Sequence, residues 1–276
     1  MSAIGTKFSA FQATWRKRGA IDALQATARW LTISWRARNP EVRNHVAQHN
    51  APFFADLGIE RQAAEQLYRA AATKVGFAAG EGDSIHRLAF ATLAAAGFKP
   101  AKILELGTSH GETTEFLAEV FPDSQITTID LPDDDPLYRR MHPKGNVRNE
   151  TVARRLARPN ITVVRANTVF LPSLDLPSFD LIWLDAGHHF PEVAWDHAFC
   201  MSRLRPGGWL FTDDVMLPDN PLARKRPEIL DVWRVVDYFN QRLDPGFRLL
   251  LKRESVRQYF VNVKYVGYYH RPVTQP

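Results

Sequence analysis

Short apolar runs alternate with segments of helical periodicity from residue 102 to residue 242, and this alternation limits the fold more than any other feature. The apolar runs predict strands at 102–106, 126–130, 161–165, 180–184 and 208–213. The helical spacing predicts helices at 111–120, 149–157, 191–203 and 228–242. Two further β-rich runs flank a polar turn and predict an antiparallel pair, Phe247–Leu251 with Tyr259–Tyr269. The expected fold class is therefore α/β, with a doubly wound, mostly parallel sheet of seven strands.

A basic helical extension precedes this pattern, so we divide the chain into residues 1–83 and a domain formed by residues 84–276. Residues 1–49 carry eight Lys and Arg residues against two acidic ones, whereas the whole chain has a net charge of +5. Within them, an amphipathic helix is predicted over residues 10–38. Three interpretations of this helix stay open: packing on the domain or on a second subunit, contact with a membrane surface, and a targeting segment. We favour packing as a lid or in a homo-oligomer.

The composition argues against several classes of protein. No run approaches the roughly 18 apolar residues that a membrane span needs, so no transmembrane segment is expected. The single cysteine, Cys200, excludes an internal disulfide framework and a cysteine-built zinc site, and it fits a reducing compartment such as the cytoplasm. A positive net charge is typical of proteins that bind nucleic acid, but the sequence has no aromatic-basic RNA-recognition motif. We therefore expect no nucleic-acid partner.

A glycine-containing loop follows the first predicted strand, with the spacing Glu105-x-Gly107-x-x-x-Gly111. Gly107 lets the chain turn sharply out of the strand, and Gly111 lets the helix and a ligand approach closely. The dinucleotide fingerprint would need a glycine where Ser109 stands, so a pyrophosphate cofactor is disfavoured. The loop therefore indicates a nucleotide-like ligand without a pyrophosphate; the alternative is a tight turn that binds no ligand.

A polar side chain stands at or just after the end of each later parallel strand. Ligands of doubly wound sheets bind outside the carboxyl ends of the strands, so these side chains should define the site. Asp130 ends the second strand, 19 residues beyond Gly111, where a carboxylate can accept hydrogen bonds from both hydroxyls of a ribose. The alternative is that Asp130 caps the turn before Pro132. The polar residues after the other strands are Asn167, Asp185, His188, Asp213 and Asp214.

The loop and two later segments together resemble the class I S-adenosylmethionine (SAM) methyltransferases. The later segments are Phe179–Asp185 and Leu204–Asp214, which contain a strand, a Pro-Gly-Gly turn and a second strand. Over roughly residues 84–268 the chain looks most like the metal-dependent O-methyltransferases related to the catechol and macrolide sugar enzymes. The resemblance implies a Rossmann-like fold and a SAM site made by Glu105, Gly107, Thr108, Ser109, Gly111, Asp130, Asn167 and Asp185.

The resemblance also implies roles for three of these residues. Glu105 would orient the loop and the amino group of SAM, and Asp130 would bind the ribose. Asn167 stands where the family often has an aspartate that faces the adenine amino group. An amide oxygen can accept that hydrogen bond, but asparagine after a strand is also a common turn residue, and both interpretations stay open.

Three carboxylates, Asp185, Asp213 and Asp214, match the positions of the family's metal ligands. Acids at adjacent strand ends repel one another unless a cation lies among them, and ligands with only oxygen donors suit Mg²⁺. The sequence therefore predicts a magnesium site; the alternative is that Asp213 and Asp214 only bind the loop backbone. His188 stands where the catechol enzymes carry a lysine base, and a neutral imidazole can accept the proton of a hydroxyl. We therefore expect Asp185 and His188 to be catalytic; the alternatives for His188 are that it ligates the metal or only binds a nearby carboxylate.

The expected function is SAM-dependent methylation of a hydroxyl group on a small molecule, such as a sugar, a phenol or a polyketide-type natural product, with the assistance of Mg²⁺. Two alternatives stay open. One is an RNA- or membrane-associated protein that uses the basic N-terminus and keeps the methyltransferase fold only as a scaffold. The other is a hydroxylase-like relative that retains the fold and the acidic residues but performs different chemistry.

Overall fold

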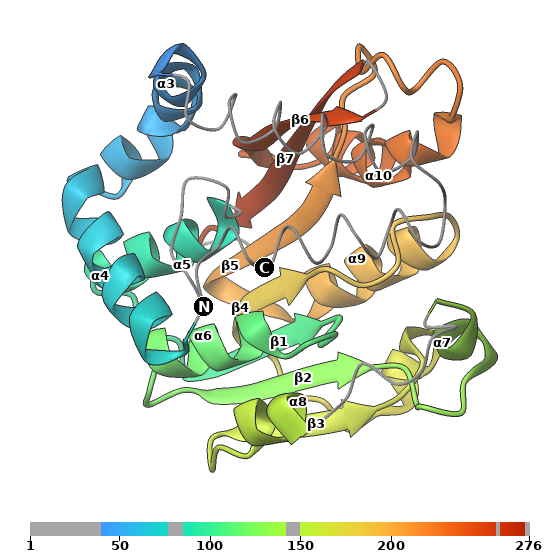
Figure 1. Cartoon of the computed structure of the whole chain (residues 1–276). Coiled ribbons are helices and arrows are strands. Elements are labelled where there is room, and N and C mark those ends of the chain that lie inside the picture. The colour runs from blue at the N-terminus through green and yellow to red at the C-terminus, as the bar shows by residue number, and fades with distance from the viewer. Residues whose placement is uncertain (1–39, 77–84, 142–149, 258–259, 274–276) are drawn as a thin grey trace, which may run out of the picture.

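A seven-stranded sheet forms the centre of the protein in the computed structural model (Figure 1). The structure describes residues 40–76, 85–141, 150–257 and 260–273. The strands lie in the order β3-β2-β1-β4-β5-β7-β6, and β7 runs antiparallel to both of its neighbours. The strands are β1 (Lys102–Leu106), β2 (Gln125–Asp130), β3 (Ile161–Arg165), β4 (Phe179–Leu184), β5 (Leu204–Val215), β6 (Arg248–Arg257) and β7 (Phe260–His270). This is the predicted α/β class with its antiparallel closing pair.

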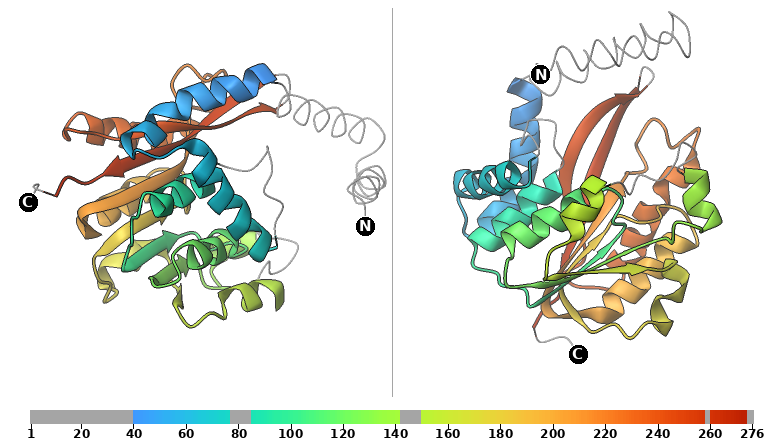
Figure 2. Two further views of the ribbon diagram at one scale, coloured as in Figure 1. Left: turned by 90° about the vertical axis from the view of Figure 1, so that its left-hand side faces the viewer. Right: turned by 60° about the horizontal axis from the view of Figure 1, so that its bottom comes forward.

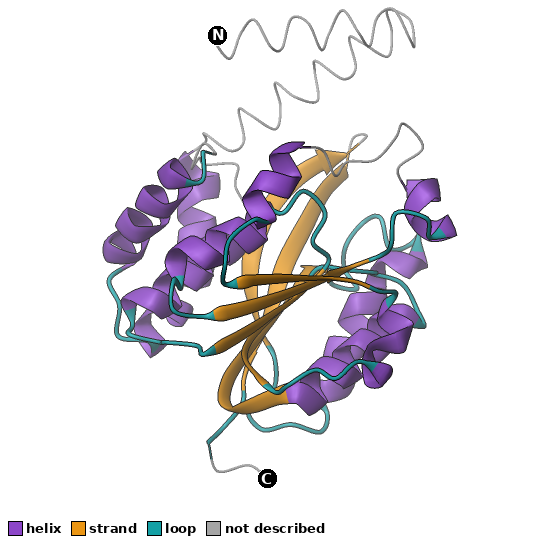
Figure 3. Cartoon of the chain, turned by 90° about the horizontal axis from the view of Figure 1, so that it is seen from below, coloured by secondary structure: helices purple, strands orange, loops and turns teal. Residues whose placement is uncertain are grey.

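Helices cover both faces of the sheet (Figure 3). They are α3 (Pro40–Asp56), α4 (Arg61–Lys74), α5 (Ile85–Ala95), α6 (Glu112–Val120), α7 (Pro136–Met141), α8 (Glu150–Leu156), α9 (Glu192–Arg203) and α10 (Asp231–Asn240), with two 3-10 turns, η1 (Thr168–Ser173) and η2 (Pro227–Leu230). Among the described residues, no helix has both the length and the apolar character that crossing a membrane requires.

The two faces of the sheet belong to separate hydrophobic cores, because successive residues of a strand point to opposite faces. Ile103 and Trp183 pack with helices α3 to α6, whereas Leu104 and Leu184 pack with α9 and α10. Both faces of the central strands β1 and β4 are therefore buried, which leaves the strand ends as the place where polar groups can meet a ligand.

Helix α3 lies along the outer strands of the sheet, as Figure 2 shows. Phe53 is 2% exposed and packs edge-on against the rings of Trp209 and Tyr268. The Asn50 amide donates to the carbonyl oxygen of Leu251 at 3.1 Å and accepts from the Leu251 N–H at 2.7 Å. The described part of the extension therefore shares a core with the domain. The helix predicted over residues 10–38 lies outside the described residues.

The predicted elements differ from the observed ones mainly at their ends. Strand β5 begins at Leu204, before the Pro-Gly-Gly turn, rather than at residue 208. The helix predicted over 228–242 is divided into η2 and α10. The sequence pattern also missed two short elements, α7 and η1. Pro136 begins α7, where the missing N–H of proline costs nothing, and the side chain of Asn167 caps η1.

We predict that Phe53→Ala lowers the free energy of unfolding by about 3–5 kcal/mol, because it leaves a cavity between α3 and the sheet. Chemical denaturation followed by circular dichroism measures this change. Phe170→Ala is the matched control, since Phe170 is 60% exposed and its truncation should change stability little. Equal stability of the two variants would contradict the packing of α3 into the core.

Candidate active site

The glycine loop between β1 and α6 joins the ends of three strands. Gly107 has a φ of +98° and Gly111 a φ of +68°, which are conformations that favour glycine. A Cβ atom on Gly107 would lie 2.2 Å from the carbonyl oxygen of Asp185, so β1 and the end of β4 approach too closely for a side chain there. The N–H of Gly107 donates to the carbonyl oxygen of Ile129 at 2.8 Å. The loop therefore fixes the ends of β1, β2 and β4 relative to one another.

Glu105 lies beneath this loop and is 1% exposed. One of its carboxyl oxygens accepts hydrogen bonds from the hydroxyls of Thr128, at 2.6 Å, and Thr114. The Thr108 hydroxyl contacts that of Thr128 at 2.6 Å and is buried as well. Burial raises the pKa of Glu105 to about 7, even though the two threonine hydroxyls act in the opposite direction. The side chains of Glu105 and Thr108 thus hold the loop from within.

Asp130 closes the loop from β2. Its Oδ2 accepts a hydrogen bond from the N–H of Ser109 at 2.8 Å, and its Oδ1 accepts one from the N–H of Leu131 at the same distance. The first bond holds Ser109 at a φ of +45°, which non-glycine residues rarely adopt. Both bonds cap the turn after β2, as one of the two interpretations of Asp130 predicted.

Asn167 follows β3 and caps η1. Its side-chain oxygen accepts a hydrogen bond from the N–H of Val169 at 3.1 Å. This is the turn-residue role that the sequence analysis left open, and it uses the oxygen that was expected to face an adenine amino group.

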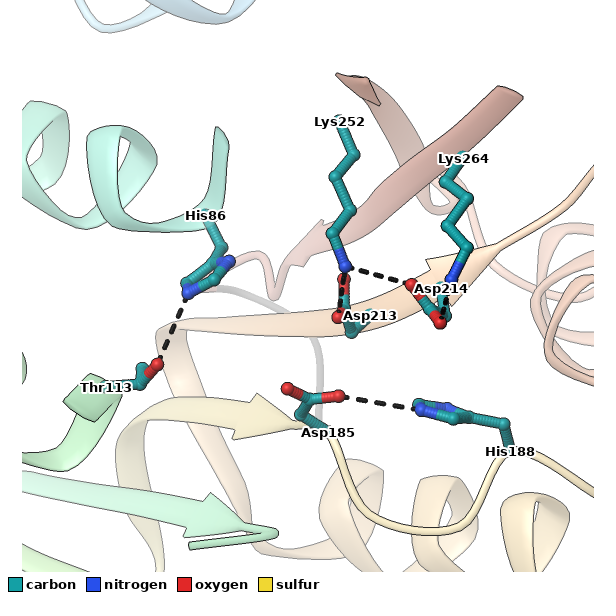
Figure 4. Close-up of polar contacts among 8 residues, drawn as sticks. All are labelled: His86, Thr113, Asp185, His188, Asp213, Asp214, Lys252 and Lys264. Atoms are coloured by element: carbon teal, nitrogen blue, oxygen red, sulfur yellow. Dashed lines mark hydrogen bonds and ion pairs between the residues drawn. The ribbon is translucent and has the colours of Figure 1, made fainter. Parts of the chain in front are cut away.

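Asp213 and Asp214, at the end of β5, bind two lysines that the sequence analysis did not consider (Figure 4). Lys252 Nζ lies 2.7 and 2.5 Å from the two carboxylate oxygens of Asp213 and 2.9 Å from Oδ1 of Asp214. Lys264 donates to Oδ2 of Asp214. All four carboxylate oxygens of the pair therefore accept a hydrogen bond from an ammonium group.

The lysines and the acids meet because two neighbouring pairs of strands shift register. The β5–β7 pairing shifts between Thr212 and Val215, which places Asp213 and Asp214 in a bulge. The β6–β7 pairing shifts between Leu251 and Arg253, which places Lys252 in a second bulge. Bulges change the direction of side chains and are common beside active sites. Asp214 also has a φ of +54°, a strained conformation for a non-glycine residue.

The ion pairs with Lys252 and Lys264 determine the protonation state of Asp214. Burial alone would raise the pKa of Asp214, but Lys252 and Lys264 outweigh it and hold that pKa below its ordinary value. Burial likewise opposes the charge of Lys252, yet Asp213 and Asp214 raise its pKa overall. The side chain of Lys252 is only 5% exposed, so these are charges in a largely dry environment.

Asp185 and His188 lie below this cluster, at the end of β4. Their closest atoms, Asp185 Oδ1 and His188 Nε2, are 3.6 Å apart, which is longer than a hydrogen bond. Burial and the neighbouring Asp213 raise the pKa of Asp185 well above its ordinary value. Burial lowers the pKa of His188, although Asp214 and Asp213 act against this. His188 is therefore a neutral imidazole near pH 7 and can accept a proton.

Two other histidines near the strand ends have different surroundings. His189 points away from the cluster: its Nδ1 faces Asp231 at 3.7 Å, and its side chain is 57% exposed. His86 stacks on Trp183 with ring centroids 4.5 Å apart, and its Nε2 lies 3.3 Å from the Thr113 hydroxyl. Figure 4 shows His86 on the other side of Asp185 from His188. His86 could not be identified from the sequence, because a lone histidine in a helix such as α5 carries no signal of its site.

The three carboxylates, as they lie here, do not fit the predicted magnesium site. Mg²⁺ needs free carboxylate oxygens, and every oxygen of Asp213 and Asp214 already accepts a hydrogen bond from Lys252 or Lys264. Cations do lie among the acids, as the repulsion between the carboxylates predicted, but they are the ammonium groups of Lys252 and Lys264. The described residues also contain no cluster of three or more His, Cys, Asp or Glu side chains that could hold a metal ion.

Part of the chain matches a known protein family. Residues 104–215 match a family model described as a methyltransferase domain. No curated protein matches the chain.

Similar solved structures include O- and N-methyltransferases. The O-methyltransferase TomG from Streptomyces achromogenes, involved in tomaymycin synthesis and solved with SAM, is 20% identical, with a TM-score of 0.48 over 77% of this chain and 91% of TomG. An O-methyltransferase from Bacillus cereus in complex with SAH is 14% identical, with a TM-score of 0.46 over 76% of this chain and 91% of its own. The N-methyltransferase NodS from Bradyrhizobium japonicum is 15% identical, with a TM-score of 0.45 over 68% of this chain and 94% of its own.

We predict that Gly107→Ala abolishes the binding of S-adenosylhomocysteine, because the new methyl group would collide with the backbone of Asp185 and open the loop. Isothermal titration calorimetry measures the binding. Gly58→Ala is a matched control, since Gly58 also has a positive φ, +64°, but a Cβ there would meet nothing within 4 Å. The control should cost about 1–2 kcal/mol of stability and retain full affinity. Unchanged affinity of Gly107→Ala would mean that the loop does not hold the ligand.

The raised pKa of Glu105 predicts a pH-dependent effect of Glu105→Gln on stability. The folded protein keeps the Glu105 proton up to about pH 7, whereas the unfolded chain releases it near the ordinary value of 4.5. The stabilisation from Glu105 is therefore complete below pH 4.5 and is lost as the pH rises to 7. Relative to the wild type, the variant should gain about 3 kcal/mol over this range in urea titrations.

The control for this experiment is Glu119→Gln, because the shift at Glu119 has the opposite sign. A hydrogen bond from Lys74 lowers the pKa of Glu119, so its stabilisation is present at neutral pH and is lost as the pH falls. This variant should lose stability relative to the wild type as the pH rises through the acid range. A flat profile for Glu105→Gln would show that folding does not raise the pKa of Glu105.

Proposed function

We propose that the protein is a class I, SAM-dependent methyltransferase that transfers the methyl group of SAM to a hydroxyl group of a small molecule. The match of residues 104–215 to a family model described as a methyltransferase domain and the order of the seven strands support this proposal. The acceptor classes that we favour are sugars, phenols and polyketide-type natural products. In this proposal His188 is the general base, and the glycine loop with Asp130 holds SAM.

The observation that supports the proposal most directly is the short distance between the loop and the end of β4. The loop at Gly107 touches the backbone of Asp185, and His188 follows only three residues later. A donor bound on the loop would therefore lie beside a neutral imidazole. Holding donor, acceptor and base in line is the main contribution that a protein makes to a direct displacement.

The loop supplies the features that SAM binding needs. Gly107 and Gly111 let the loop pack closely against Asp185 and Leu156, where a Cβ would not fit, and the carboxylate of Asp130 lies against the loop at the end of β2, where it would bind the ribose hydroxyls. Glu105 and Thr108 hold the loop in this shape from beneath, and Ser109 and Asn167 contribute through the backbone and the cap that they form. SAM supplies an electrophilic methyl group on a sulfonium when it is bound.

In the proposed reaction His188 is the proton acceptor. Its Nε2 accepts the proton of the acceptor hydroxyl while the hydroxyl oxygen bonds to the methyl carbon and the carbon–sulfur electron pair stays on sulfur. The products are the methyl ether, S-adenosylhomocysteine and an imidazolium. Asp214 and Asp213 favour the imidazolium electrostatically, whereas Lys264 and Lys252 oppose it. Solvent then takes the proton, which restores the neutral base.

We predict that His188→Ala lowers turnover by about 10²–10⁴-fold, the contribution typical of a general base, and leaves SAM affinity unchanged. The assay uses isotopically labelled SAM with a panel of sugar, phenol and polyketide alcohols, and mass spectrometry detects the labelled ether. Calorimetry with SAM gives the affinity. His189→Ala should keep the wild-type rate, because His189 points away from the cluster towards Asp231. A normal rate for His188→Ala would exclude His188 as the base.

A further inference from the structure

The ammonium groups of Lys252 and Lys264 occupy the positions where a metal ion would bind the acid pair. Lys252 Nζ is within 2.9 Å of three carboxylate oxygens, and Lys264 binds the fourth. A metal ion could bind Asp213 or Asp214 only after displacing an ammonium group from it. Figure 4 shows both lysines reaching the acids from above, from strands β6 and β7.

The lysines are held in place by the fold. Lys252 is 7% exposed and stands in the β6 bulge, directly after Leu251, whose backbone N–H and carbonyl both bind Asn50 of α3. Lys264 lies on β7 with 18% of its side chain exposed. Loss of its carboxylate partners would leave Lys252 with a buried, uncompensated charge, which is strongly destabilising. The lysine and the acids therefore hold one another in place.

The charges of the pair are also balanced. Two carboxylates face two ammonium groups, and Asp185, the third acid, lies next to Asp213 under conditions that favour its neutral form. A divalent cation added to this cluster would bring two positive charges to a site that has no net negative charge left to neutralise. Electrostatics therefore opposes metal binding here, whereas three free carboxylates would favour it.

We propose that Lys252 and Lys264 replace the divalent cation at this site, so that the two ammonium groups keep Asp213 and Asp214 ionised and in place and methyl transfer needs no metal. The second half of this statement rests on the proposed function. Without a metal ion, nothing at this site lowers the pKa of the acceptor hydroxyl, so a side chain must accept its proton. A neutral His188 beside the cluster can do this.

The test is to remove the lysines and measure metal binding directly, without any acceptor. Mn²⁺ is titrated into the full-length protein, and electron paramagnetic resonance reports free Mn²⁺. The proteins are the wild type, the double variant Lys252→Met with Lys264→Met, and the control Lys99→Met, which removes an exposed lysine distant in sequence from the cluster. We expect the wild type and Lys99→Met to show only weak binding, and the double variant to bind one Mn²⁺ at least about tenfold more tightly.

A second variant shows whether the acids bind this Mn²⁺. Asp213→Asn and Asp214→Asn, added to the double lysine variant, should return Mn²⁺ binding to the wild-type level. If the double lysine variant folds poorly, Mn²⁺ should raise its melting temperature but not that of the wild type, and Lys264→Met alone, which frees one carboxylate oxygen, should show a smaller gain in binding. The proposal is overturned if the wild type binds one Mn²⁺ that Asp213→Asn abolishes, or if loss of the lysines brings no gain.

A separate activity measurement tests the mechanistic half. Turnover of labelled SAM by the wild type should be the same with and without EDTA, and a tenfold or greater loss that Mn²⁺ or Mg²⁺ restores would overturn metal independence. Failure to methylate any alcohol under either condition would count against the proposed function, while the Mn²⁺ titrations would still decide what occupies the acid pair.

Discussion

The ion cluster of Lys252 and Lys264 with Asp213 and Asp214 is the interaction on which the rest of the site depends. Carboxylates at the ends of adjacent strands repel one another in a dry environment, and the sheet can bring them together only with a compensating charge. Two bulges supply it by directing the side chains of β5 and β6 to the same place. Burial keeps His188 neutral by lowering its pKa, and Lys264 and Lys252 act in the same direction.

Most of the fold could be predicted from the sequence, because its strands and helices differ clearly in hydrophobic period. Strand β1 ends at Leu106 and β3 spans Ile161–Arg165, as the pattern predicted. The short elements escaped prediction, since a six-residue helix such as α7 has too few turns to show a period. The glycine loop could also be predicted, because Gly107 and Gly111 have positive φ angles, which glycine adopts more readily than any other residue.

The identity of the cation could not be predicted in the same way. Lys252 is 39 residues from Asp213 in the chain and Lys264 is 50 from Asp214, so the pairing depends on the registers of β6 and β7. The available signal was a lysine directly after the apolar run Leu249–Leu251, at the end of a predicted strand. A buried charge in such a position needs a partner, and the acids at the end of β5 are candidates. Only the register shifts of the two bulges show that Lys252 reaches them.

The hydrogen bonds between Asn50 and Leu251 limit how far the chain can be shortened from its N-terminal side. They join a helix before residue 84 to the backbone that presents Lys252, although these segments are 201 residues apart in the chain. A truncation that keeps only residues 104–215, the segment that matches the family model, would remove these hydrogen bonds as well as the ring of Phe53 from the sheet. Helix α3 is therefore better regarded as part of the folded unit that carries the site than as a separate extension.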